Sequence, residues 1–345
     1  MRIGVIGAGA VGGAIAALLA RAGHEVEVTA RGAHLDAIRE RGIHLTGGWG
    51  EYTATVLANE TLTRGPELAI LATKAQDAVA AIRENVALLR GVPLVVVQNG
   101  LDSLTNAHAA TPRSDIVGAL ATYATSYLSP GEIAITTPGP TYLGVEGEND
   151  LPARYAARIL NEVMPTTVIP NFRGAQWTKL VINQVNALPA ITGLSVQEVV
   201  ANRRLRRVMT SSMRECVRIG FASRVHYEKL QGLGPRLLRL FSTLPMWAGQ
   251  ALPALMSARI GRTPNPGSTL QSIRRGQASE IDYLNGSVVR AAEARGRRAP
   301  VNAALVALVH EVEASGEFFT ADAVVARVSG RFRAVSIRAA RYSTS

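Results

Sequence analysis

Residues 2–12 read RIGVIGAGAVG, an apolar run that leads directly into a G-x-G-x-x-G spacing. The apolar run predicts a buried strand at residues 2–6, and the small residues that follow predict a helix at residues 10–22. A second strand is predicted at residues 25–30, which completes a βαβ unit of about 30 residues. In this context the glycine-rich loop predicts a dinucleotide-binding site, because the loop and the helix N-terminus can hold a pyrophosphate.

The three glycines of this loop have different purposes. Gly7 permits a tight turn, Gly9 lets the backbone approach the pyrophosphate, and Gly12 permits close packing of the helix on the strand. The first turn of the helix presents free N–H groups and the positive end of its dipole to the phosphates. We therefore predict that one continuous loop binds the cofactor, through Gly7, Ala8, Gly9, Ala10, Val11 and Gly12.

The end of the second strand indicates which dinucleotide is bound. NAD sites usually place Asp or Glu there to bind the ribose 2′-hydroxyl, whereas this chain has Ala30 followed by Arg31. A guanidinium suits a 2′-phosphate, and Lys74, just after a predicted strand at residues 67–73, would add a second positive charge. The alternative for both side chains is an ordinary solvated surface residue. The sequence predicts NADP(H) rather than NAD(H).

The remaining periodicity divides the chain into an α/β part and a helical part. Strands are predicted at residues 93–98, 116–127 and 132–136 and a helix at 77–89, which together indicate a mixed sheet with helices on both faces. Helical periodicity then dominates at residues 176–191, 205–223, 280–295 and 302–315. We predict an N-terminal Rossmann-type dinucleotide-binding domain (1–170), an all-α C-terminal substrate and catalytic domain (171–330) and a basic tail (331–345).

The composition excludes several classes of protein. With 345 residues, 47% of them hydrophobic and 18% charged, the chain is typical of a globular protein of two domains rather than a disordered one. The single cysteine, Cys216, rules out an intrachain disulfide and a cysteine-based zinc site, and the histidine spacing gives no sign of a metal. We recognise no signal peptide and no transmembrane run, so a cytoplasmic enzyme is the default interpretation.

The charge is distributed unevenly. Residues 1–170 hold 12 basic and 16 acidic residues, a net charge of −4, and residues 171–345 hold 25 and 10, a net charge of +15. A basic half is typical of proteins that bind nucleic acid or anionic membranes, but it also steers small anions to a site. Because nearly all of these residues are arginine in an alanine-rich chain, the excess can equally reflect codon usage and have no function.

An apolar segment interrupts the helical half at residues 237–260. Pro245, Gly249 and Pro253 argue against one continuous helix there. Three interpretations stay open: part of the domain core or a homodimer contact, a flap over the substrate, or a membrane-surface segment.

Two polar clusters in the helical half are candidates for the chemistry. Lys179, Asn183 and Asn186 lie at i, i+4 and i+7, and so on one face of a predicted helix that is otherwise apolar. The alternative is a polar stripe that faces water. In the second cluster a new helix is predicted near Glu280, which places that carboxylate in a first turn, where the helix dipole favours it. Ser268 lies a dozen residues earlier, where it could also act as a helix N-cap.

Taken together, these motifs resemble those of the ketopantoate reductases, the 2-dehydropantoate 2-reductases. The matching stretches lie between residues 7 and 286 and are GAGAVG (7–12), TKA (73–75), QNG (98–100), WTKLVIN (177–183) and SEIDYLNG (279–286). The K-x-x-x-N element is shared with related hydroxyacid dehydrogenases, and the E-I-D-Y-x-N-G stretch is far more specific.

The resemblance implies a role for each matching residue. Lys179 corresponds to the general acid, and Glu280 to a glutamate beside the lysine and the cofactor ribose. Asn183 and Ser268 correspond to residues that hold the substrate. Asn99 corresponds to a residue beside the nicotinamide, where both cofactor and substrate are within reach, and Ala124 to a backbone contact with the cofactor.

Two departures from the family pattern concern the substrate side. The family has an asparagine at the position of Ala187, and Asn186 is the candidate to replace it, although on an ideal helix the two positions are about 100° apart. Roughly twenty extra residues separate the lysine and glutamate motifs, around residues 237–260.

The resemblance implies reduction of a small anionic 2-oxoacid by NADPH, with 2-dehydropantoate, a precursor in pantothenate biosynthesis, as the expected substrate and (R)-pantoate as the product. A different 2-oxo or 3-hydroxy acid on the same fold is one alternative, and an NADPH-binding sensor without turnover is another. We expect no nucleic-acid or membrane partner and no metal, and a homodimer stays open.

Overall fold

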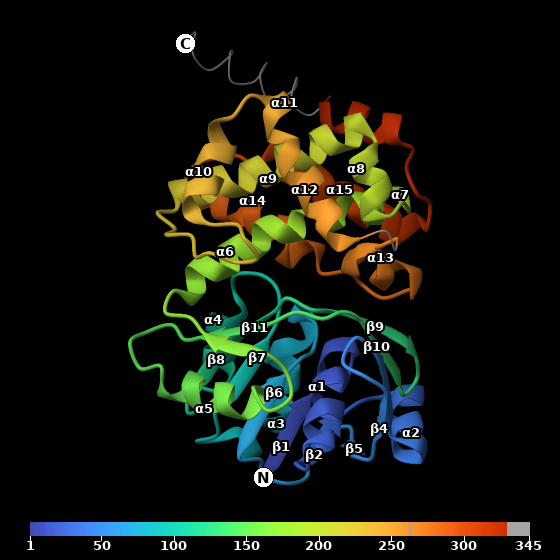
Figure 1. Cartoon of the computed structure of the whole chain (residues 1–345), viewed down its shortest axis with the longest axis vertical. Coiled ribbons are helices and arrows are strands. Elements are labelled where there is room, and N and C mark those ends of the chain that lie inside the picture. Colours follow the sequence, from blue (N-terminus) through green and yellow to red (C-terminus); the bar gives the residue numbers. More distant parts are fainter. Residues whose placement is uncertain (262–263, 330–345) are drawn as a thin grey trace. The chain divides into compact units, whose positions relative to one another are not determined.

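The computed structural model describes residues 1–261 and 264–329 (Figure 1). The chain divides into two compact units, the first ending at Phe172 and the second beginning at Arg173. The predicted basic tail at residues 331–345 lies outside the described residues.

The first unit is built on an eight-stranded mixed sheet. Its neighbouring strands run parallel, except that β11 runs antiparallel to β8. The prediction of a mixed sheet is therefore confirmed. In spatial order the strands are β12 (Thr166–Val168), β11 (Thr141–Gly144), β8 (Ile116–Ala121), β7 (Leu94–Val97), β6 (Leu68–Leu71), β1 (Arg2–Ile6), β2 (Glu25–Thr29) and β5 (Leu57–Asn59).

Helices cover both faces of this sheet, because its central strands are apolar on both sides. Ile70 and Val95 belong to one buried core with α1 (Ala10–Arg21) and α5 (Leu151–Leu160). Their sequence neighbours Leu71 and Val96 belong to a second core with α3 (Ala78–Leu89) and α4 (Ser103–Ala110). This alternation is the period of two of a strand, and it confirms the predicted α/β architecture.

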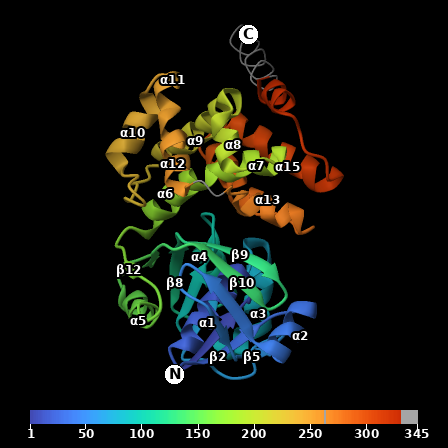
Figure 2. The ribbon, with the colours of Figure 1, turned by 45° about the vertical axis from the view of Figure 1, so that its right-hand side comes forward.

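A smaller sheet covers the outer side of α1 (Figures 1 and 2). Its strands in order are β4 (Tyr52–Ala54), β3 (Ile43–Gly47), β10 (Glu132–Thr137) and β9 (Ala124–Ser129), and α2 (Gly32–Arg41) precedes β3. The prediction of one strand over residues 116–127 is wrong. The chain leaves the large sheet at Thr122, whose N–H and hydroxyl both donate to the Pro140 carbonyl, and it enters the small sheet at Ala124.

The described part of the second unit, residues 173–261 and 264–329, is helical (Figures 1 and 2). The helices are α6 (Phe172–Asn183), α7 (Ala187–Thr192), α8 (Val196–Ala201), α9 (Arg203–Ala222), α10 (Pro235–Thr243), α11 (Met246–Gly249), α12 (Ala251–Ile260), α13 (Gly267–Arg274), α14 (Asn285–Glu293) and α15 (Pro300–Ser315), with a further helical stretch at 321–329.

Two predicted helices have different bounds in the structure. The segment 176–191 is not one helix, because the 3₁₀ turn η2 (Gln184–Asn186) separates α6 from α7. Glu280 is not in the first turn of a helix. It precedes the short 3₁₀ turn η3 (Ile281–Tyr283), and α14 begins only at Asn285.

The apolar segment 237–260 forms parts of α10, α11 and α12, in agreement with the helix breaks expected at its prolines and glycine. Leu238 and Phe241 are buried in the second unit, whereas Trp247 is 77% exposed. Two arginines of α9 hold the end of α10: Arg214 donates to the carbonyls of Leu244 and Pro245, and Arg218 donates to that of Ser242. Of the three interpretations of segment 237–260, the first therefore applies in part, because some of its residues belong to the core of the second unit.

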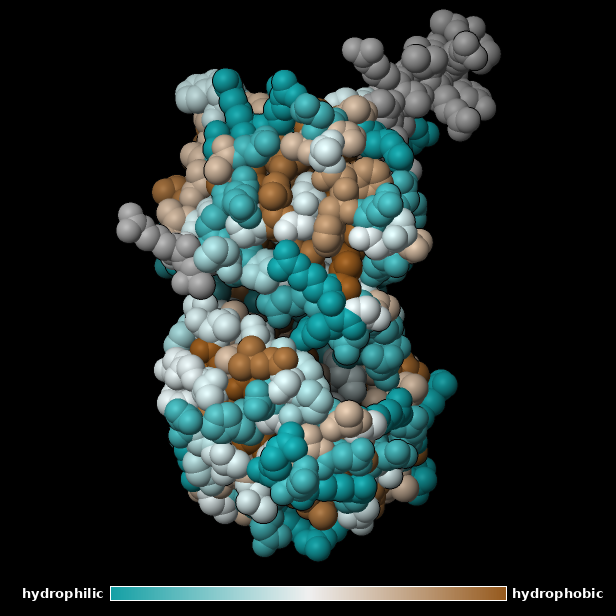
Figure 3. All heavy atoms as spheres, turned by 90° about the vertical axis from the view of Figure 1, so that its right-hand side faces the viewer, coloured by the Kyte–Doolittle hydropathy of each residue, from teal (hydrophilic) through white to brown (hydrophobic). Residues whose placement is uncertain are grey.

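On the face shown in Figure 3, the surfaces of both units are largely hydrophilic, with smaller hydrophobic patches between the polar residues. Within residues 1–261 and 264–329, none of the helices has the length and apolar character that crossing a bilayer requires.

Close packing at the start of α1 gives a prediction for Gly12. A Cβ atom at Gly12 would lie 2.0 Å from the carbonyl oxygen of Gly7, so Gly12→Ala must displace backbone. We expect a loss of about 1–3 kcal/mol in the free energy of unfolding, the usual cost of overpacking. Gly9→Ala is the matched control, because a Cβ there meets no atom of the described residues within 4 Å. Urea unfolding of both variants is the measurement, and equal stabilities would contradict the packing argument.

Candidate functional site

The glycine-rich loop is fixed to the end of β2. The N–H groups of Gly7 and Ala8 donate to the hydroxyl and carbonyl oxygens of Thr29, at 2.9 and 2.8 Å. Gly7 has a φ of +95°, a conformation that side chains other than glycine rarely adopt. The loop therefore has one backbone path, which ends where α1 begins at Ala10.

The loops that follow β6 and β7 lie at the same edge of the sheet. A Cβ atom on Gly7 would be 2.7 Å from the Thr73 methyl group, so the loop after β6 touches the glycine loop. The Gln98 amide, at the end of β7, donates to the Thr73 carbonyl at 2.9 Å. Lys74 and Asn99 are the next residues of these two loops. The structure thus brings the glycine loop, Lys74 and Asn99 together at the carboxyl ends of the strands, where α/β sheets bind ligands.

Gly9 tests whether this edge suits a dinucleotide. Its φ of −65° is open to any residue, and among residues 1–261 and 264–329 no atom would lie within 4 Å of a Cβ atom there. Neither the backbone conformation nor the packing of the protein therefore requires glycine at this position. A ligand that must approach the backbone closely does require it, and the phosphates of a dinucleotide at the N-terminus of α1 are such a ligand.

Arg31 lies at the residue before α2, beyond the end of β2. Its guanidinium makes a two-oxygen contact with the Glu84 carboxylate of α3, at 2.8 and 3.0 Å. The Arg31 side chain is 71% exposed, and that of Glu84 is 42% exposed. An exposed ion pair of this kind contributes little to stability, so Arg31 can exchange its partner for another anion at small cost.

His34 links the glycine loop to Gly131 through its two ring nitrogens. This role was not predicted from the sequence. Its Nδ1 accepts from the Gly131 N–H at 3.0 Å, which leaves Nε2–H to donate to the Ala8 carbonyl at 2.7 Å. Burial lowers the pKa of His34, and the hydrogen bond to Ala8 opposes that shift.

Ala124, the predicted backbone contact, is the first residue of β9, and its carbonyl accepts from the Thr136 hydroxyl at 3.2 Å.

In the second unit, Lys179 lies on α6 among buried apolar residues. Trp177, Leu180 and Val181 are each 3% exposed or less, and Lys179 itself is only partly exposed. Burial lowers the pKa of the Lys179 amine from its ordinary value of 10.5 to about 8. A lysine with this pKa carries its proton at neutral pH and releases it more readily than a surface lysine does.

The 3₁₀ turn η2 follows Asn183 and contains Asn186. Because residues three apart eclipse one another in a 3₁₀ turn, Asn186 stays on the same side as Asn183. Ala187, the position where the family has asparagine, is fully buried. Asn183 is also buried, and Asn186 is partly exposed.

Asn186 also lies next to the beginning of α13. A Cβ atom on Gly267 would be 2.6 Å from the Asn186 side-chain oxygen. Ser268 is the next residue, and its position differs from the alternative of a helix N-cap: α13 begins at Gly267, and Ser268 is an exposed residue of its first turn. The structure therefore places Asn186 beside Gly267, the residue before Ser268.

A buried amide network joins the lysine motif to the glutamate motif. The Asn285 amide donates to the side-chain oxygens of Gln184 and Asn302, at 2.8 and 2.9 Å, and the Ser212 hydroxyl donates to Gln184 at 2.8 Å. All four side chains are fully buried. Buried polar groups with this many mutual contacts fix one arrangement of the helices that carry them. Gln184 was not predicted from the sequence, although a glutamine in the run VINQVNALP indicates a buried polar contact.

Comparison with known proteins follows the same two-part division. The family model described as "Ketopantoate reductase PanE/ApbA" matches residues 3–147, and "Ketopantoate reductase PanE/ApbA C terminal" matches residues 171–313. A 2-dehydropantoate 2-reductase of Pyrococcus horikoshii is 26% identical over 319 residues, covering 92% of this chain and 99% of that protein. One from Archaeoglobus fulgidus is 27% identical over 322 residues, covering 90% and 98%.

Solved structures agree in fold. The PanE/ApbA family ketopantoate reductase from Ralstonia eutropha JMP134 is 29% identical with a TM-score of 0.77, covering 91% of this chain and 99% of that one. The ternary structure of D-mandelate dehydrogenase with NADH and anilino(oxo)acetate has a TM-score of 0.78 and the same coverage. At 19% identity, the latter shows the fold alone.

The lowered pKa of Lys179 can be measured directly, because the chain has only three lysines. Reductive methylation with ¹³C-formaldehyde gives each lysine amine its own NMR signal. We expect one of these signals to titrate with a midpoint near pH 8 and to disappear in Lys179→Arg, while Lys229→Arg keeps it. A Lys179 midpoint above about 10, the range of an ordinary lysine, would show that burial does not perturb this amine.

Proposed function

Because the chain belongs to the ketopantoate reductase family, we propose that it reduces 2-dehydropantoate to (R)-pantoate with NADPH. The observation that carries this proposal is the Lys179 amine, partly buried on α6, with a pKa near 8 and the amides of Asn183 and Asn186 following it. That group is a proton donor suited to the reduction of a ketone.

The first unit would hold the cofactor. Residues 7–12 would bind the pyrophosphate, Arg31 and Lys74 the 2′-phosphate, and Asn99 and the Ala124 backbone the nicotinamide end. The family match at residues 279–286 adds Glu280 as a contact to the ribose. The reduced nicotinamide, when bound, supplies the hydride that converts the ketone carbon into that of an alcohol.

The protein's own contribution is to stabilise and protonate the oxygen. Negative charge develops on the ketone oxygen as the carbon is reduced, and the Lys179 ammonium stabilises that charge and then donates its proton. Glu280 would orient the amine. Asn183, Asn186 and Ser268 would hold the polar groups of the substrate. The net charge of +15 over residues 171–345 would attract both the 2-oxoacid and the cofactor.

A panel of 2-oxoacids assayed with NADPH and with NADH tests the proposal. We expect 2-dehydropantoate to give the highest kcat/KM, with NADPH preferred. If another 2-oxoacid is reduced and 2-dehydropantoate is not, the enzyme is a reductase of a different substrate on the same fold. Tight NADPH binding without any turnover would make it a sensor.

Arg31 gives a prediction for cofactor choice. Arg31→Ala should raise KM for NADPH and leave that for NADH nearly unchanged, because a charge-assisted contact with the 2′-phosphate is worth about 1.5–3 kcal/mol, or roughly 10- to 150-fold. Arg39→Ala is a control, because Arg39 on α2 donates to Ala58 and Asn59 of β5 instead. An unchanged NADPH to NADH preference in Arg31→Ala would remove this assignment.

Lys179 gives a prediction for the chemistry. General-acid assistance contributes about 10²–10⁴-fold, so Lys179→Ala should lower kcat by that order while NADPH still binds. Lys179→Arg should recover little activity, because a guanidinium does not give up its proton near neutral pH. Lys229→Ala, at an exposed lysine of the same unit, is the control. A Lys179→Ala enzyme with near wild-type kcat would show that the proton comes from elsewhere.

A further inference from the structure

We propose that His310 is a positioning residue for Glu280: as an imidazolium between two carboxylates, it holds the segment 279–282 that carries Glu280. The part of this inference that concerns catalysis rests on the proposed function, whereas the holding of the segment is a property of the fold.

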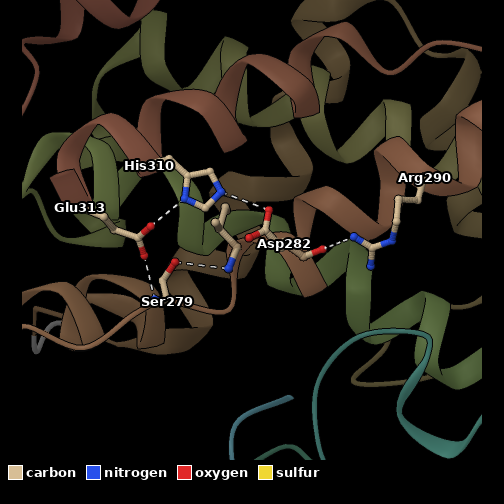
Figure 4. A network of polar contacts seen from close by, with 6 residues as sticks. Ser279, Asp282, Arg290, His310 and Glu313 are labelled. Carbon is tan, nitrogen blue, oxygen red and sulfur yellow. Dashed lines mark hydrogen bonds and ion pairs between the residues drawn. The ribbon is translucent and has the colours of Figure 1, made fainter. Parts of the chain in front are cut away.

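His310, on α15, has a carboxylate at each ring nitrogen (Figure 4). Its Nδ1 lies 2.7 Å from an oxygen of Glu313, one turn further along the same helix, and its Nε2 lies 3.1 Å from an oxygen of Asp282 in η3. The ring thus bridges α15 and the turn that follows Glu280.

The contacts of this cluster secure the chain on both sides of Glu280. Before it, the Ser279 N–H donates to the second oxygen of Glu313 at 2.7 Å, and the Ser279 hydroxyl accepts from the Ile281 N–H at 3.3 Å. After it, the Asp282 carbonyl accepts from Arg290 of α14 at 2.8 Å (Figure 4).

Glu280 itself depends on these neighbours for its conformation. Its φ and ψ are −96° and 22°, near the sparsely allowed region between helix and strand. Glu280 is the N-cap of η3, and its carbonyl accepts from the N–H groups of Tyr283 and Leu284 at 2.9 and 3.0 Å. The point at which its side chain leaves the backbone is therefore set by residues 279–282, which the cluster holds.

The geometry favours a charged His310. A neutral imidazole has one N–H, so one of the two carboxylates would face a ring lone pair. Burial lowers the pKa of His310, but the hydrogen bonds and charges of Glu313 and Asp282 outweigh burial and raise it above its ordinary value. For Glu313 the signs are opposite. Burial raises its pKa, but its contacts with Ser279 and His310 outweigh burial and lower that pKa below its ordinary value.

Other charged groups near α15 also have partners. Arg290 of α14 donates to the Asp282 carbonyl and to the Ser287 hydroxyl. Glu311 pairs with Arg327, and Glu215 of α9 accepts from the backbone at the beginning of α15. The segment Ala187–Thr192, which forms α7, has no titratable side chain.

The sign of the pH dependence follows from the raised pKa. The cluster's contribution to stability is complete below the ordinary histidine pKa of 6.5 and is lost as the pH rises through the higher pKa of the folded protein. Above that pH one carboxylate loses its hydrogen bond, and residues 279–282 are held less firmly.

Amide hydrogen exchange tests the holding of the segment without reference to catalysis. At about pH 6, His310→Gln should lose protection at Ser279 and Ile281, because a neutral amide cannot donate to both carboxylates in the same way. In the wild type, protection corrected for intrinsic exchange should fall as the pH rises through the raised pKa of His310. The control His108→Gln changes an exposed histidine of α4 and should alter neither. Equal protection in all three proteins would overturn the proposal.

A double-mutant cycle with Glu280→Ala tests whether His310 acts through Glu280. His310→Gln should lower kcat by up to about 10²-fold, the cost of misplacing a catalytic group by about 1 Å, and should weaken NADPH binding. In the Glu280→Ala background, the same substitution should change both quantities much less. Additive effects would show a general structural role and overturn the proposal.

Two controls keep the outcomes distinct. Asp282→Asn, which removes one carboxylate with little change of shape, substitutes for His310→Gln if that variant does not fold. If the wild type shows no turnover, the proposed function fails, and NADPH affinity in the same cycle still decides whether His310 acts through Glu280.

Discussion

The cost of keeping the Lys179 amine charged among apolar side chains is the constraint on which the second unit depends. Burying a cation costs free energy. For Lys179 this cost lowers the pKa of the amine to about 8. The amides of Gln184, Asn285 and Asn302 fix the helices around it through buried hydrogen bonds. A core of apolar residues alone would be easier to pack. It would not, however, fix the position of the lysine motif relative to the glutamate motif.

The first unit has a different constraint, which is the close approach of backbone atoms in the glycine-rich loop. Gly12 is glycine because the Gly7 carbonyl occupies the place of its Cβ atom, and Gly7 is glycine because its φ is positive. Gly9 satisfies no such requirement of the protein itself. The same loop therefore contains glycines that the fold needs and one that a bound dinucleotide would need.

Features that depend on local sequence could be predicted, and those that depend on distant partners could not. The first βαβ unit and the face of α6 that carries Lys179 follow from spacing within a few turns of chain. The 3₁₀ turn at residues 184–186 could not be read from the continuous apolar pattern, nor could the change of sheet at Thr122. The Arg31–Glu84 and His310–Asp282 pairs join residues 53 and 28 positions apart, which no periodicity reveals.

The central claim is that Lys179 delivers the proton during reduction. Single-turnover stopped-flow of the wild type with NADPH prebound, followed from about pH 7 to 9.5, tests it most directly. The account predicts that the rate constant for reduction of 2-dehydropantoate falls towards a tenfold loss per pH unit above a midpoint near pH 8. A rate constant that stays flat to pH 9.5 would contradict it, because the amine would then have lost its proton without consequence.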